Sequence, residues 1–141
     1  MQPPDNSNAS RSLVFITLAA LVLCLAAGFG LFSGTAAGKF GGVLSLLAVV
    51  RREEFVPAPY RALAFIDTEV PLPEGQCMLA PRVEARLLQE LRLARHESVL
   101  EVGAGSGYMA ALLAHQSQRV ATLEIRPALA AMARANLQRA G

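Results

Sequence analysis

Two acidic residues and three glycines in the C-terminal third of the chain have the types and spacing of a nucleotide-type binding site. Glu101 stands two positions before the first of three alternating glycines, Gly103, Gly105 and Gly107, and Glu124 follows about 20 residues later. Glycine can adopt positive φ and lets the backbone approach a ligand closely. An acid at the distance of Glu124 takes the ribose hydroxyls of a bound nucleotide. The pattern therefore predicts a ligand with a ribose, held between the glycines and Glu124.

Glu101 distinguishes between two classes of such ligand. The stretch from Gly105 to Ala110 fits the G-x-G-x-x-A form, so the pattern alone leaves a nicotinamide-dependent oxidoreductase open. A carboxylate directly before the glycines would repel a pyrophosphate, whereas it would attract an ammonium group. S-adenosylmethionine has an ammonium group, a sulfonium and no phosphate. We therefore expect S-adenosylmethionine at this site.

Strands and helices of an open α/β sheet must position these residues. An apolar run predicts a strand over Ser98–Val102, and Arg119–Ile125 predicts a second strand that carries Glu124 near its end. Helices are expected over Met109–Ala114 and Ala128–Arg139, the latter with proline in its first turn. Strand, glycine turn, helix and strand together begin a Rossmann-like sheet.

Composition excludes several other classes of function. The chain has 141 residues, enough for one modest domain, and is 53% hydrophobic with the excess near the N-terminus. A net charge of +2 with scattered arginines predicts no nucleic-acid partner. Cys24 and Cys77 have no C-x-x-C partner and are expected to be unpaired thiols. His96 and His115 lack ligand spacing and are expected at the surface or at helix ends, so no metal site is predicted.

The N-terminal region predicts a membrane anchor. Residues 1–10 are polar and are expected to form a disordered tail. Leu13–Phe32 has neither charge nor proline, and as a helix it would span about 30 Å, the thickness of a bilayer core. A transmembrane helix over 11–33 is favoured, an export signal is the alternative, and a buried core helix is disfavoured because the run has no polar face. Because more basic residues follow the span than precede it, the C-terminal part is expected in the cytoplasm.

The middle of the chain is expected to be largely irregular. Residues 34–42 are glycine-rich and predict a linker, which an apolar helix over Val43–Val50 follows. Arg51–Glu54 is interpreted as a solvated turn of mixed charge. Prolines interrupt the stretch up to Pro81, apart from a short helix within it, and Arg82–Leu93 is a clear amphipathic helix. We divide the chain here into a substrate region, 43–97, and the first two βα units of a cofactor-binding domain, 98–141.

Three blocks give the chain a resemblance to a known family. The blocks are Arg52–Pro57, the loop Gly75–Pro81 and the stretch Leu100–Tyr108. The family is that of the protein-L-isoaspartate O-methyltransferases, which are class I S-adenosylmethionine-dependent enzymes. The first block resembles its substrate region, the second resembles its G-Q-T-I-S-x-P signature, and the third resembles its cofactor motif. The resemblance implies methyl transfer to the carboxyl of an isoaspartyl residue in a protein or peptide, as a repair reaction. It also implies roles for the site residues: Glu101 for the cofactor's amino group, the three glycines for its methionine part, Glu124 for its ribose, and Gln76 and Cys77 at the mouth of the site.

The chain departs from the family pattern in the signature loop and at both ends. Leu79 stands at the position of the family's serine, whose hydroxyl lies at the reacting carboxylate, and Cys77 stands at the threonine position. Leucine cannot donate a hydrogen bond. The chain stops after two βα units, which predicts a truncated α/β methyltransferase sheet behind the apolar N-terminal helix. A membrane-tethered, non-catalytic cofactor-binding module is the alternative function.

Overall fold

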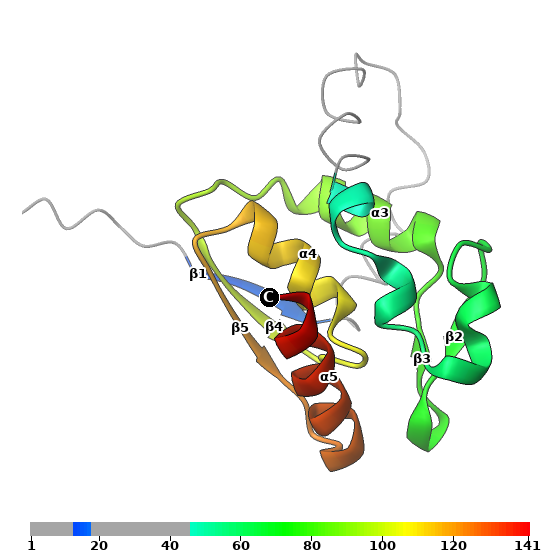
Figure 1. Cartoon of the computed structure of the whole chain (residues 1–141). Coiled ribbons are helices and arrows are strands. Elements are labelled where there is room, and N and C mark those ends of the chain that lie inside the picture. The colour runs from blue at the N-terminus through cyan, green and yellow to red at the C-terminus, as the bar shows by residue number, and fades with distance from the viewer. Residues whose placement is uncertain (1–12, 18–45) are drawn as a thin grey trace, which may run out of the picture.

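The computed structural model describes residues 13–17, for their backbone, and residues 46–141 (Figure 1). Three parallel strands form the main sheet, and a short hairpin, the helices α3, α4 and α5 and three 3₁₀ helices pack around its helical side within these ranges. The elements in chain order are β1 (Leu13–Thr17), η1 (Arg52–Glu54), η2 (Ala58–Leu63), β2 (Val70–Pro71), η3 (Pro73–Gly75), β3 (Cys77–Met78), α3 (Pro81–Leu91), β4 (Ser98–Val102), α4 (Tyr108–Gln116), β5 (Arg119–Leu123) and α5 (Pro127–Ala140). The predicted α/β class is confirmed.

The main sheet has the strand order β1–β4–β5, with both pairings parallel. β4 has the predicted bounds, and β5 ends at Leu123, so Glu124 lies just beyond the strand. α4 is the crossover helix that parallel pairing of β4 and β5 requires. The register pairs Glu101 with Thr122, which brings the predicted acid beside a hydroxyl on the neighbouring strand.

The sheet contains a strand that the sequence analysis placed in a transmembrane helix. Leu13–Thr17 pairs with β4 as a strand, so the expectation of a helix over Leu13–Phe32 is wrong for these five residues. Val, Phe, Ile and Thr favour strands, and an apolar run this short does not distinguish a buried strand from a helix. Residues 18–32 of that span, the tail at 1–10 and the linker at 34–42 lie outside the described residues. Within the described ranges, no helix is long and apolar enough to cross a membrane.

The helices cover one face of β4 and β5. Val99 and Glu101 are buried on this face, and Val120 and Thr122 on β5 are partly buried beside them. α4 and α5 lie next to each other beside the sheet (Figure 1), and residues 108–113 of α4 are all buried. The alternate positions point to the other face, and Val102 and Leu123 among them are exposed. The site is therefore supported by a core that lies on the helical side of the sheet.

The segments between residues 50 and 91 pack against that core on one side of α4 and α5, to the right in Figure 1. α3 begins with Pro81 at its first position and ends at Leu91, and the capping residue Arg92 adopts the left-handed conformation with φ 49°. On its inner face Leu87 and Leu88 are buried, as the amphipathic pattern predicts, and so is Glu84. The outer face carries an ion pair between Arg86 and Glu90, four residues apart.

The interpretation of Arg51–Glu54 as a solvated turn is wrong for one residue. Arg52 is buried, with 3% of its surface exposed, because its guanidinium finds acceptors on segments far along the chain. Of the expected helix Val43–Val50, residues 46–49 are helical and 43–45 lie outside the described residues. His96 and His115 are exposed, as expected.

Candidate functional site

The glycine turn between β4 and α4 is held against the end of β5 by its backbone. The N–H groups of Gly103 and Ala104 both donate to the carbonyl oxygen of Leu123, over 2.8 and 3.1 Å. Gly103, Gly105 and Gly107 have φ values of +98°, +54° and +86°, a region that residues with a side chain rarely adopt. The prediction that these glycines are needed for positive φ is confirmed at all three positions.

Gly107 differs from the other two glycines in what lies next to it. A Cβ at position 107 would lie 3.1 Å from the carbonyl oxygen of Ala133 and 3.2 Å from its Cα, both on α5. A Cβ at position 103 would meet nothing within 4 Å. Gly107 therefore permits the close approach of two helices, while Gly103 faces open space.

A small cavity of about 40 Å³ lies between the glycine turn and the hairpin β2–β3. Its walls come from the hairpin and the loop after it, from α3, and from the stretch between β4 and the first turn of α4. The lining residues are Leu72, Cys77, Met78, Leu79, Glu84, Glu101, Gly103, Ala104, Gly105, Ser106, Tyr108 and Met109. A cavity of this size has room for about three water molecules. It can enclose one end of a ligand the size of S-adenosylmethionine.

Glu101 is one of two buried acids that line this cavity, and Glu84 is the other. Only 1% of the surface of Glu101 is exposed, and the hydroxyl of Thr122 donates a hydrogen bond of 2.5 Å to its Oε2 atom. Its Oε1 atom is buried and has no hydrogen-bond partner among the described residues. Burial raises the pKa of Glu101 to about 7; the Thr122 hydrogen bond opposes this rise, and the Glu124 carboxylate adds to it. A buried acceptor without a partner is unfavourable, so this oxygen is ready to accept a donor from a ligand.

Glu124 lies against the outside of the glycine turn. Its Oε2 accepts a hydrogen bond from the N–H of Gly105, and its Oε1 accepts one from the N–H of Arg126, each over 3.0 Å. Burial alone would raise the pKa of Glu124, but hydrogen bonds from the backbone N–H groups of Gly105, Arg126 and Ile125 outweigh it and hold the pKa below its usual value. The carboxylate is therefore ionised at neutral pH and retains lone pairs for further donors.

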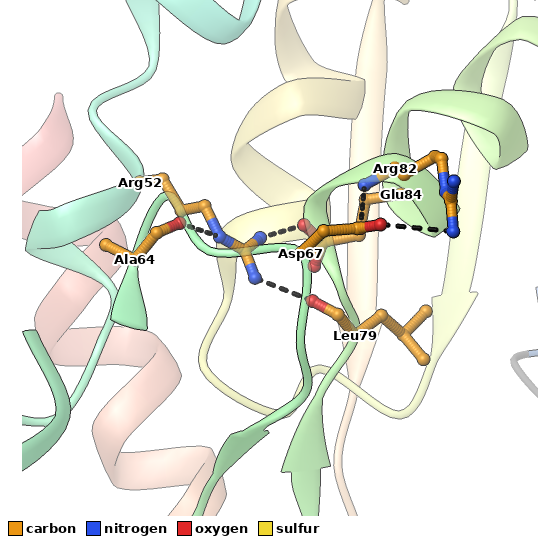
Figure 2. Close-up of polar contacts among 6 residues, drawn as sticks. All are labelled: Arg52, Ala64, Asp67, Leu79, Arg82 and Glu84. Carbon is orange, nitrogen blue, oxygen red and sulfur yellow. Dashed lines mark hydrogen bonds and ion pairs between the residues drawn. The ribbon is translucent and has the colours of Figure 1, made fainter. Parts of the chain in front are cut away.

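The loop that contains Leu79 is held by Arg52 (Figure 2). The Nη2 atom of Arg52 donates to the carbonyl oxygen of Leu79 over 2.6 Å, and its Nε donates to that of Ala64 over 2.9 Å. Its Nη1 atom donates to the carboxylate of Glu84 in a buried ion pair. Burial raises the pKa of Glu84 to about 8, although the Arg52 guanidinium acts in the opposite direction. Figure 2 shows the Leu79 side chain pointing away from Arg52.

The structure brings together most, though not all, of the residues that the sequence analysis assigned to the site. Glu101, Gly103, Gly105, Cys77 and Leu79 line the same cavity. The other three, Gln76, Gly107 and Glu124, are not among its lining residues. The side chain of Gln76 is partly buried, and its Nε2 donates to the carbonyl oxygen of Glu74. Cys77 is exposed, and its pKa is raised by burial and by the nearby Glu69 carboxylate, so the thiol is neutral at pH 7.

Sequence reasoning missed several residues of the site, above all Arg52, Glu84, Thr122 and Tyr108. One of them had a visible signal. Glu84 precedes Leu87, Leu88 and Leu91 by three, four and seven positions, which places an acid on the apolar face of an amphipathic helix. A charge at such a position needs a buried partner. Arg52 carried no comparable signal, because it lies in a run of charged residues.

Known proteins of one family are similar to this chain over about 70% of its residues. The family model for protein-L-isoaspartate(D-aspartate) O-methyltransferase (PCMT) matches residues 37–141. A protein-L-isoaspartate O-methyltransferase of Koribacter versatilis is 43% identical over 99 residues, which cover 70% of this chain and 45% of the relative. A protein of the same name from Aeropyrum pernix is 46% identical over 102 residues, or 70% of this chain and 39% of the relative.

The chain thus spans less than half the length of these curated relatives. The matched residues include the whole glycine turn, the hairpin and the loop with Leu79. Because the family model covers well over half of the sequence, the chain belongs to the protein-L-isoaspartate(D-aspartate) O-methyltransferase family.

Proposed function

We propose that this chain forms the part of an S-adenosylmethionine-dependent methyltransferase that binds the methionine end of the cofactor and faces the substrate. The acceptor we propose is the carboxylate of an isoaspartyl residue in a damaged protein or peptide. The membership of the family and the names of the relatives support this proposal. The observation that carries it is the Oε1 atom of Glu101, buried without a partner beside the glycine turn.

The residues of the cavity fit the cofactor's cationic end. A buried carboxylate oxygen without a partner favours a charged donor such as an ammonium group. The same oxygen would repel the pyrophosphate of a nicotinamide dinucleotide. A cavity of about 40 Å³ is too small for a whole nucleotide, so the nucleoside part of the ligand would lie outside it, along the turn toward Glu124. These features favour S-adenosylmethionine over NAD.

When bound, the cofactor supplies an electrophilic methyl group on its sulfonium. The substrate carboxylate is already nucleophilic, so the residues of this chain need to orient and exclude water rather than move a proton. Glu101 would hold the amino group, Gly103 and Gly105 would let the backbone lie close to the methionine part, and Glu124 would accept the ribose hydroxyls. Cys77 and Leu79 would form the side of the cavity on which the methyl acceptor enters, with Gln76 beside them.

Calorimetric titration of the full chain with S-adenosylmethionine and with NAD tests the proposal. We expect saturable binding of the former and none of the latter. Glu101→Gln and Glu124→Ala should each weaken binding by about 1.5–3 kcal/mol, the contribution of a hydrogen bond to a charged group. The exposed carboxylate of Glu90 provides a matched control, since Glu90→Gln should leave the affinity unchanged. Binding of NAD, or unchanged affinity in Glu101→Gln, would refute the proposal.

A non-catalytic cofactor-binding module remains a second candidate because of Leu79. Its apolar side chain lines the cavity at the position where the family has a serine. The lining residues that carry a hydroxyl group, Ser106 and Tyr108, belong to the glycine turn and to α4 rather than to the loop with Leu79. Retained affinity for S-adenosylmethionine without methylation of any isoaspartyl peptide would identify this second function.

A further inference from the structure

We infer that Arg52 is a positioning residue for the substrate side of the site. It acts by fixing the main chain of Leu79 and the first turn of α3 against the cofactor-binding half. This inference rests on the proposed function and adds to it a residue that contacts neither cofactor nor substrate. Arg52 does not line the cavity, but it contacts three residues that do: Leu79, Glu84 and Tyr108.

The guanidinium connects segments that are far apart in the chain. Its three nitrogens donate to Ala64 at the end of η2, to Glu84 on α3 and to Leu79 in the loop between β3 and α3. Its Cζ atom lies 5.0 Å from the centre of the Tyr108 ring. Tyr108 is the first residue of α4, directly after the glycine turn. One buried group therefore joins the substrate-side loop to the element that follows the cofactor motif.

The loop depends on such an anchor because its local structure is slight. The hairpin beside it pairs only two residues on each strand, Val70–Pro71 with Cys77–Met78. An isolated two-stranded hairpin is at best marginally stable in water. The Arg52 hydrogen bond holds Leu79 through its carbonyl oxygen, so the direction of the Leu79 side chain is set by the backbone (Figure 2). Misplacement of a site wall by about 1 Å can reduce turnover a hundredfold.

Neutralising the Glu84 carboxylate does not explain all of the contacts that Arg52 makes. An ion pair with Glu84 uses one nitrogen of the guanidinium, and the other two donate to backbone carbonyl groups. Lysine would keep the charge, but its single ammonium does not reproduce the planar fork that reaches these separate acceptors. The two roles therefore make different demands on the side chain, and variants can separate them.

Two variants and a control test the inference in the full chain. Arg52→Lys keeps the charge and loses the fork. The double variant Arg52→Met with Glu84→Gln removes both buried charges, so it avoids an unpaired carboxylate and should fold. Arg82→Lys is the control, because it makes the same exchange of side chain at the surface. Arg82 lies in the first turn of α3 and forms an ion pair with Asp67, but 85% of its side chain is exposed (Figure 2).

Peptide-resolved hydrogen exchange is the first measurement. Both Arg52 variants should increase exchange at residues 76–84 by about tenfold or more, the fold-change expected when a charged hydrogen bond is lost from a locally opening segment. In these variants, peptides from β4 and α4 should exchange as slowly as in the parent chain. In the Arg82→Lys control, residues 76–84 should exchange at the same rate as in the parent chain. Restoration of parent exchange in the double variant would show that Arg52 only neutralises Glu84, and would overturn the inference.

Cofactor binding and turnover on an isoaspartyl peptide are the second measurement. In Arg52→Lys we expect the dissociation constant for S-adenosylmethionine to stay within about threefold of the parent, since Glu101 and the glycine turn are intact. The double variant is assessed by hydrogen exchange alone, because Glu84 lines the cavity. The turnover number should fall about tenfold or more, because orientation of the acceptor is lost. Equal turnover in Arg52→Lys and the parent would contradict the inference. A parent chain that binds no cofactor would instead defeat the proposed function, while the exchange experiment would still decide whether Arg52 holds the loop.

Discussion

The hydroxyl of Thr122 donates a hydrogen bond to one carboxylate oxygen of Glu101 and leaves the other without a partner among the described residues. The two residues are paired across β4 and β5, so the sheet register itself brings them together. The geometry holds the carboxylate in a single orientation and leaves one acceptor available in the cavity. Because the group is buried, its pKa is raised to about 7, within the range of ordinary assays.

The affinity for S-adenosylmethionine should follow a bell-shaped curve against pH. Below pH 7 Glu101 becomes protonated and loses its attraction for the ligand's amino group, so the affinity should fall by up to about tenfold per pH unit. Above about pH 8 the amino group of the ligand loses its own proton. Calorimetry from pH 5.5 to 9 should place the maximum between these values. In Glu101→Gln the acid side of the curve should disappear, and a curve that keeps it would assign the titration to another group.

The free energy of unfolding should decrease as the pH rises from 6 to 8. A carboxyl whose pKa is raised in the folded state binds its proton more tightly there than in the unfolded chain, so it contributes stability at low pH that is lost as pH rises from about 4.5 through the folded pKa. For Glu101, with a folded pKa of about 7, this amounts to roughly 1 kcal/mol over the interval. Glu84, raised to about 8, acts in the same direction.

Urea unfolding of the parent and of Glu101→Gln at both pH values measures the contribution of Glu101. The difference in stability between pH 6 and pH 8 should be smaller in the variant by roughly 1 kcal/mol. A parent chain that becomes more stable at pH 8 would show that Glu101 and Glu84 are not raised in the folded state.

Alanine at Gly107 should destabilise the chain more than alanine at Gly103. Both substitutions force a side chain into positive φ, at about 1–2 kcal/mol. Only the Cβ at position 107 also crowds the backbone of Ala133, at 3.1–3.2 Å, and the small shift that this requires adds about 1–3 kcal/mol of overpacking. Denaturant midpoints of the two variants provide the comparison. Gly103→Ala should mainly weaken cofactor binding, because Gly103 lines the cavity, and equal losses of stability would contradict this division of roles.

Serine at position 79 should increase turnover on an isoaspartyl peptide. A substrate carboxylate beside Leu79 finds no hydroxyl donor there, and one missing hydrogen bond to a charged group corresponds to about 1.5–3 kcal/mol, or roughly ten- to a hundredfold in rate. Leu79→Ala is the matched control, since it removes the bulk of leucine without adding a donor. Equal and substantial turnover in the parent, Leu79→Ser and Leu79→Ala would mean that backbone orientation of the loop suffices.

Local pattern alone determined the cofactor side of this protein. Several features of this region are set by neighbours within a few residues. They are the bounds of β4, the positive φ of the three glycines, the helix after them and the proline that begins α5. Such features depend on backbone sterics, strand propensity and helix periodicity, which a sequence displays directly. The resemblance to the family rested on the same continuous motifs, and the family model confirms it.

The opposite wall of the site was decided by tertiary structure. Arg52 reaches acceptors 12, 27 and 32 positions away in the sequence, at Ala64, Leu79 and Glu84, and no local pattern records such pairings. Leu13–Thr17 forms a strand because the edge of β4 satisfies its backbone groups, whereas its apolar sequence is equally compatible with a membrane helix. In both cases the outcome depends on hydrogen-bond partners that only folding brings within reach, so burial of a charge and choice of strand over helix could not be read from composition.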